Sequence, residues 1–117
     1  MSIVQKYGVV AASAILALIV GAAGIAKLSG VPMVHQSFAI LGLPVWFGYF
    51  IGACEVAGVV GLFVRQLSAL AAAGLAIIGA GAVYFHITHT SLSQGIPAFI
   101  VLVLAVFIAL KRRPATV

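Results

Sequence analysis

The feature that most constrains the fold is an apolar stretch from Leu43 to Val64 that carries a single charge. A helix of about 20 apolar residues is long enough to cross a bilayer, and this stretch meets that requirement. Glu55 lies near its middle and is the only acidic residue in the chain. A carboxylate in hydrocarbon costs about 3 kcal/mol on insertion scales, so it normally faces a partner, a cavity or a ligand. The function therefore depends on what Glu55 faces.

The rest of the chain is equally apolar. Of its 117 residues, 65% are hydrophobic and 6% are charged, whereas a soluble domain usually carries about 25% charged residues. This composition cannot form a water-soluble surface, and it predicts an integral membrane protein. The net charge of +5 is divided among the ends of apolar runs and forms no patch, which argues against a nucleic-acid partner. Cys54 is the only cysteine, which excludes an intrachain disulfide and a cysteine-cluster metal site.

Hydropathy predicts an all-α membrane protein: one domain over residues 1–117, built as a four-transmembrane-helix bundle. The predicted helices span residues 7–26, 44–64, 67–87 and 96–110. The first is interpreted as an uncleaved span, and Pro97 falls in the first turn of the fourth, where proline is tolerated. Residues 27–42 carry a short apolar stripe interrupted by Pro32, which predicts an interfacial or re-entrant segment, with an ordinary loop as the alternative.

The basic residues predict the orientation. Four spans place both termini on one side, together with Lys6, Arg65 and the basic run 111–113, while Lys27 stands alone on the other side. By the positive-inside rule, both termini are cytoplasmic. We therefore expect an integral protein of the bacterial cytoplasmic (inner) membrane. Extracytoplasmic activity of a reporter fused after Val117 would contradict this orientation.

Small residues predict where the helices meet. Gly48 and Gly52 form a GxxxG step for helix packing, and Glu55 shares their face, so its carboxylate points at a helix interface. Lys27 and His86 lie near the outer ends of their helices, and Glu55 is expected to pair with Lys27 or to hydrogen-bond His86. We predict an outward-opening ligand pocket lined by Lys27, Glu55, Tyr84 and His86, with Trp46 and Tyr49 as aromatic walls.

Four short motifs stand in a familiar order: residues 24–30 (GIAKLSG), 38–46 (FAILGLPVW), 52–58 (GACEVAG) and 82–86 (AVYFH). Their order and spacing resemble the DoxX-like family of small four-helix membrane proteins, from about Gly8 to Leu110. The resemblance implies a link to redox chemistry or assembly: founding members are associated with a thiosulfate:quinone oxidoreductase, others with redox or detoxification complexes, and distant relatives with membrane-protein assembly. The recurring polar positions of the family fall on Lys27, Glu55 and His86. The single cysteine argues against the dithiol chemistry proposed for some relatives.

The first functional hypothesis is a membrane subunit that binds a quinone or another lipophilic ligand within a redox or assembly complex. The predicted pocket would supply donors for the quinone carbonyls, a proton acceptor and ring walls. The sequence carries no haem, flavin or iron–sulfur motif, so electrons would come from a redox partner protein.

Three alternatives remain open. In a non-catalytic scaffold or assembly factor, Glu55 and Lys27 are only a structural ion pair. In a proton-coupled small-molecule transporter, Glu55 exchanges a proton for a cation. In a metal site, His86 and His89 bind an ion together with Glu55 and His35. We also expect contact with membrane lipid and a homo-oligomer, because glycine- and alanine-rich faces favour helix association. The sequence assigns no reaction and no catalytic residue.

Overall fold

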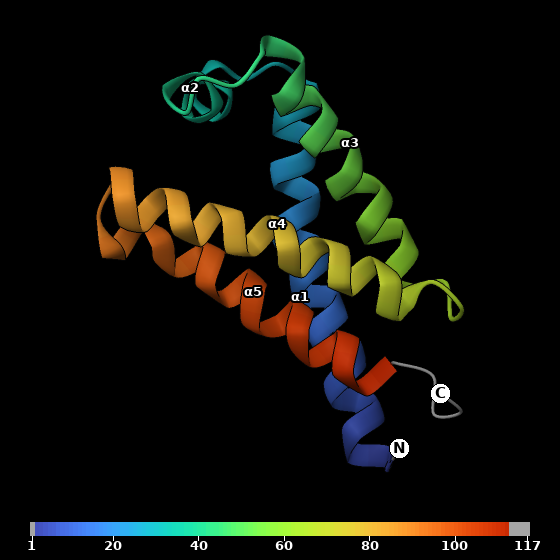
Figure 1. The fold of residues 1–117 in the computed structure, drawn as a ribbon. Coiled ribbons are helices and arrows are strands. Elements are labelled where there is room, and N and C mark those ends of the chain that lie inside the picture. The colour runs from blue at the N-terminus through green and yellow to red at the C-terminus, as the bar shows by residue number, and fades with distance from the viewer. Residues whose placement is uncertain (1, 113–117) are drawn as a thin grey trace.

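The computed structural model describes residues 2–112, and in this part of the chain it contains five α-helices and no strand (Figure 1). The helices are α1 (Ile3–Leu28), α2 (Pro32–Ile40), α3 (Val45–Leu62), α4 (Ser68–His89) and α5 (Leu92–Arg112). Four of them, all except α2, are long and apolar enough to cross a membrane. This confirms the predicted all-α class with four transmembrane helices. Arg113, the last residue of the predicted basic run, lies outside the described residues.

The helix ends differ from the hydropathy prediction because local hydrogen bonds set them. The Ser2 hydroxyl accepts the backbone N–H of Gln5, and the Gln5 side chain accepts the N–H of Ser2. This capping box starts α1 at Ile3, ahead of the predicted start at residue 7. At α5, the Ser91 hydroxyl accepts the N–H of Gln94, so the helix begins at Leu92 and encloses Pro97. Pro97 therefore lies inside the helix, not in its first turn.

The segment between the first two spans forms the short helix α2, so it is not an ordinary loop. Gly30 and Gly42 flank it with φ angles of 76° and 75°. Glycine adopts this left-handed conformation without a steric penalty, so the chain can leave α1 and enter α3 through tight turns. α2 packs on α3 and, less extensively, on α1, and none of its residues is fully buried.

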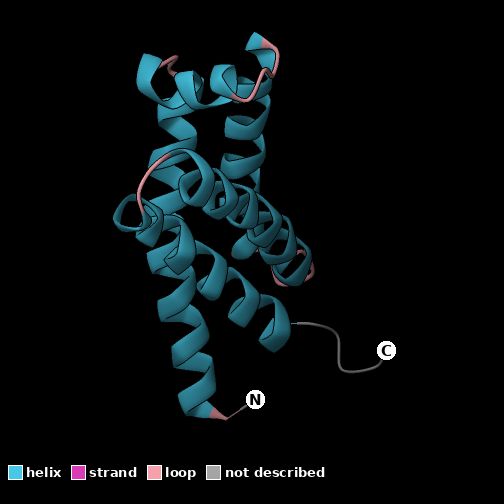
Figure 2. Cartoon of the chain, turned by 60° about the vertical axis from the view of Figure 1, so that its left-hand side comes forward, coloured by secondary structure: helices cyan, strands magenta, loops and turns pink. Residues whose placement is uncertain are grey.

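The spans associate as two antiparallel pairs. α4 packs most extensively on α5, and α1 packs on α3. Figure 1 shows the α4–α5 pair crossing α1 obliquely, and the turned view in Figure 2 agrees. The end of this pair at which α4 passes into α5 therefore projects away from the part of α1 and α3 that adjoins α2.

The core lies where the two pairs cross. It is built from small and branched apolar residues: Ala12, Leu16 and Val20 of α1, Leu62 of α3, Ala72 and Leu75 of α4, and Val101, Ala105 and Ile108 of α5. Their spacing of three or four residues places them on one face of each helix. Other large apolar side chains point outward: Leu18 is 77% exposed and Ile77 is 75% exposed. Such an outer surface suits hydrocarbon, where helices associate by close packing because lipid gives no hydrophobic drive.

Candidate functional site

The α1–α3 interface contains a buried ion pair. The Nζ atom of Lys27 lies 2.9 Å from Oε1 of Glu55, and the two side chains are 14% and 7% exposed. The sequence predicted either Lys27 or His86 as the partner of Glu55, and in the structure the partner is Lys27. Each charge compensates the other, which lowers the cost of placing both in an apolar span.

Two glycines allow the helices to approach closely enough for this pair to form. A Cβ atom on Gly52 would lie 2.8 Å from Cβ of Lys27 and 3.1 Å from the carbonyl oxygen of Gly24. A Cβ atom on Gly24 would lie 3.2 Å from Cβ of Glu55. Any side chain at these positions would push α1 and α3 apart. The glycine contact therefore sets the separation at which the Lys27 amine meets the Glu55 carboxylate.

His35 of α2 joins the same cluster. Its Nε2 lies 2.7 Å from the backbone oxygen of Lys27, and because a carbonyl only accepts, Nε2 carries the proton. The imidazole lies over Gly48, where an added Cβ would be 2.6 Å from Cε1 of His35. It also contacts the ring of Tyr49, with the ring centroids 4.4 Å apart. His35 thus anchors α2 to both α1 and α3.

From the sequence, His35 was predicted only as a candidate metal ligand. The residue that could have pointed to the His35 contact is Gly48. A glycine in an apolar span leaves space for a neighbouring ring, but the sequence does not show which ring fills that space. Among the described residues, no group of three or more histidine, cysteine or acidic side chains lies close enough to hold a metal.

The predicted aromatic walls have different surroundings. Tyr49 is 41% exposed, and its hydroxyl lies beside Gly30, where an added Cβ would be 3.0 Å away. Tyr49 therefore adjoins the Lys27–Glu55 cluster through His35. Trp46 is 62% exposed and packs against Phe47 and Phe50, so it lies on the outer surface of α3.

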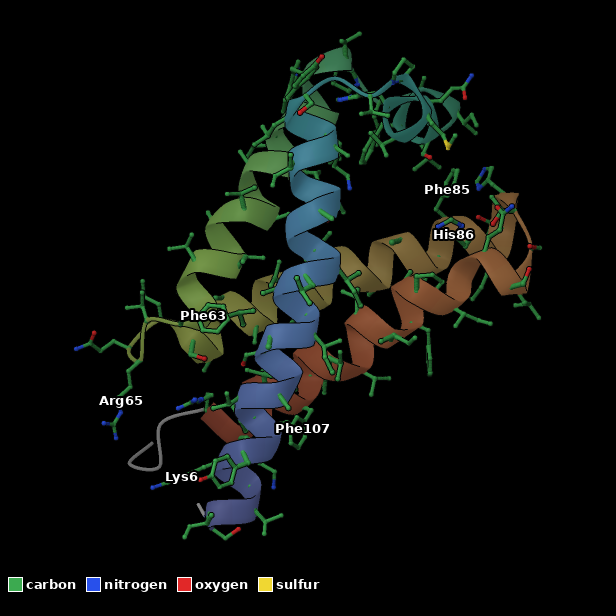
Figure 3. The ribbon with its side chains drawn as sticks, turned by 180° about the vertical axis from the view of Figure 1, so that it is seen from behind. Lys6, Phe63, Arg65, Phe85, His86 and Phe107 are labelled. Carbon is green, nitrogen blue, oxygen red and sulfur yellow. The ribbon has the colours of Figure 1, made fainter. Side chains whose placement is uncertain are left out.

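The structure places Tyr84 and His86 elsewhere. Figure 3 shows His86 near the end of α4 that projects away from α1 and α3. Its Nδ1 hydrogen-bonds the hydroxyl of Thr90 at 2.9 Å, and the neighbouring Tyr84 is 63% exposed. Five of the six predicted pocket residues therefore form two groups: Lys27, Glu55 and Tyr49 at the α1–α3 interface, and Tyr84 and His86 at the end of α4. Trp46 belongs to neither group.

Two cavities lie apart from both groups. The first, which we call the basic cavity, has a volume of about 680 Å³ and is lined by Lys6, Val10, Ser13, Leu62, Phe63, Arg65, Ser68 and Arg112. The second, the α3–α4 groove, has a volume of about 470 Å³ and an apolar lining. Its residues are Phe50, Ile51, Cys54, Ala57, Gly58, Gly61, Leu67, Leu70, Ala71, Gly74, Leu75, Ile77 and Ile78. Neither cavity could be predicted from the sequence. Each is lined by more than one helix, and hydropathy does not show how the helices are placed relative to one another.

The fold and the buried ion pair define a class: small all-helical membrane proteins with four spans and a charged pair at a helix interface. Within that class, the model of the DoxX-like family matches residues 11–108, and the chain belongs to this family. The match confirms the resemblance found in the sequence. No curated protein and no solved structure matches the chain. Family membership thus supports the membrane location, and it names no reaction.

Proposed function

We propose that this DoxX-like protein is a non-catalytic scaffold subunit that binds an apolar transmembrane helix of a neighbouring subunit in the α3–α4 groove. The observation that carries the proposal is the groove itself, an apolar surface whose lining includes the small residues Ala57, Gly58, Gly61, Ala71 and Gly74. Transmembrane helices associate where small residues let two backbones approach each other. A second copy of this chain or another membrane protein would supply the helix.

The glycines of the groove have two different surroundings. Added Cβ atoms on Gly58 and Gly61 would lie 2.8 Å from Leu75 and 2.9 Å from Ala71, so these glycines serve the contact between α3 and α4. Gly74 is exposed, and an added Cβ there would meet no atom within 4 Å. The Gly74 side of the groove is therefore open to a helix from outside the protein.

The Lys27–Glu55 pair has a structural part in this proposal. Glu55 is the only acidic side chain of the chain, and its carboxylate already has a cation at 2.9 Å. Exchange of a proton for a cationic substrate would first require separation of that pair inside the membrane. The pair instead fixes the register between α1 and α3, a role attested for buried charges.

A second candidate is the quinone-binding subunit of a redox complex. It is favoured by the clustering of Lys27, Glu55, His35 and Tyr49, which offers donors, an acceptor and an aromatic face within one region. The Lys27 amine would donate to a quinone carbonyl, and a redox partner protein would deliver the electrons. The two candidates differ in whether a molecule occupies the Lys27–Glu55 cluster, and the final experiment of the Discussion separates them.

Substitution of Gly74 by leucine tests the groove. The new side chain enters open space and leaves the fold intact, but it fills the position that a partner backbone would occupy. Overpacking an interface typically costs 1–3 kcal/mol, so we expect association to weaken about tenfold. Native gel electrophoresis of protein solubilised from its own membranes would show the assembly shifting to lower mass.

Gly21→Leu is the matched control, because Gly21 is a glycine of another span, α1, has no atom within 4 Å of an added Cβ, and does not line the groove. It should leave the assembly unchanged. The mass of the purified wild-type protein shows whether the neighbour is a second copy or another subunit. If Gly74→Leu and Gly21→Leu both keep the wild-type assembly, the groove is not the binding surface.

A further inference from the structure

The basic cavity gathers charges from three separate parts of the chain. Lys6 comes from the start of α1, Arg65 from the turn between α3 and α4, and Arg112 from the end of α5. Figure 3 shows the Lys6 and Arg65 side chains extending on the same side of the molecule. The sequence predicted only that these residues share one side of the membrane. Their common cavity is a product of the fold.

No acidic side chain can neutralise this cavity. The chain has one acidic residue, Glu55, and that carboxylate is paired with Lys27. Three cations around a single concave surface focus a positive potential into it and attract anions.

Hydrogen-bond donors along the cavity also lack acceptors. Ser68 is 1% exposed, and among the described residues its Oγ has no hydrogen-bond partner. The Nε of Arg112 is likewise buried without a partner in the described part of the chain. Buried polar groups are usually satisfied, so two unsatisfied donors lining one cavity point to an acceptor that belongs there.

We propose that the basic cavity binds the phosphate of an anionic phospholipid headgroup. Guanidinium groups bind phosphate through paired, charge-assisted hydrogen bonds, and Arg65 and Arg112 supply two of them. Basic pockets between transmembrane helices on the cytoplasmic side are a known setting for such headgroups. The apolar lining residues Val10, Leu62 and Phe63 would contact the acyl chains. A free phosphate ion shares the headgroup chemistry but would make no use of this apolar wall.

The test is lipid binding by the purified protein in detergent, with dioleoyl phosphatidylglycerol as the anionic probe and dioleoyl phosphatidylcholine as the zwitterionic one. Native mass spectrometry counts the lipids bound per chain. We expect a preference for phosphatidylglycerol that weakens about tenfold in the double variant Arg65→Gln, Arg112→Gln, because two charge-assisted bonds are lost. Lys111→Gln is the matched control, since Lys111 is exposed, adjoins Arg112 and does not line the cavity.

Three results would overturn the proposal. The first is equal binding of the two lipids by the wild-type protein. The second is a loss of about threefold in Lys111→Gln, which is half of the double variant's loss in free energy for half of its charge, because binding would then follow net charge alone. The third is inorganic phosphate that displaces phosphatidylglycerol at equal concentration, which would assign the cavity to the free ion. The thermal midpoint of each variant without lipid, unchanged from wild type, shows that a loss of binding is not a loss of fold.

Discussion

At the residue scale, three side chains hold α1, α2 and α3 together: Lys27 meets Glu55 between α1 and α3, and His35 joins α2 to both. An isolated charge in hydrocarbon is costly, so Glu55 was expected to have a partner. Lys27 is the single cation in the segment between the first two spans. The part played by His35 was not predictable, because its contacts come from α1, α2 and α3 together. His86 failed to join the pair because spacing along a helix does not fix the tilt of that helix against its neighbours.

The His35 contacts lead to a prediction about α2. His35→Ala removes the hydrogen bond to the Lys27 carbonyl and the contact with the Tyr49 ring, so we expect a loss of about 1–3 kcal/mol in the anchoring of α2. Hydrogen exchange measured by mass spectrometry should quicken over residues 32–40. Gln36→Ala, at the exposed neighbouring position, should leave exchange unchanged. Wild-type protection of α2 in His35→Ala would show that the anchor lies elsewhere.

At the element scale, hydropathy located all four spans, because a run of about 20 apolar residues has few alternatives. It misplaced the ends of α1 and α5, which depend on the hydroxyl groups of Ser2 and Ser91. The contact between α1 and α3 depends on glycine at two positions, and the GxxxG step marked only the α3 side of it. On the α1 side, helical spacing puts Gly24 on one stripe with Lys27, but the helix that this stripe meets is visible only once the helices are placed together.

The α1–α3 contact is tested by Gly52→Ala. The added methyl group would lie 2.8 Å from Cβ of Lys27, so the helices must separate and stretch the ion pair. Overpacking of this kind typically costs 1–3 kcal/mol, measured as a lower stability to unfolding in detergent. Gly21→Ala on α1 meets no atom within 4 Å and should be neutral or slightly stabilising. Equal stability of the two variants would contradict a contact set by glycine.

At the scale of the whole molecule, the arrangement of the spans could not be read from the sequence. Apolar runs specify that helices cross the membrane, but small residues on several faces allow more than one crossing geometry. The predicted pocket brought Glu55 and His86 together by their depth along upright helices. In the structure the α4–α5 pair crosses α1 obliquely (Figure 1), and the end of α4 that carries His86 projects away from α1 and α3 (Figure 3). The same crossing creates the α3–α4 groove and the basic cavity.

We propose that the Lys27–Glu55 pair is structural and holds no ligand. The most direct measurement is native mass spectrometry of the wild-type protein and the double variant Lys27→Met, Glu55→Met, each released from its own membrane. Breaking a buried pair costs about 3–5 kcal/mol, whereas replacing both partners by apolar residues is often neutral, so the double variant should fold. We predict the same assembly mass and the same bound molecules in both proteins. A stoichiometric quinone on the wild-type protein, absent from the double variant, would contradict the scaffold account and make the pair a binding site.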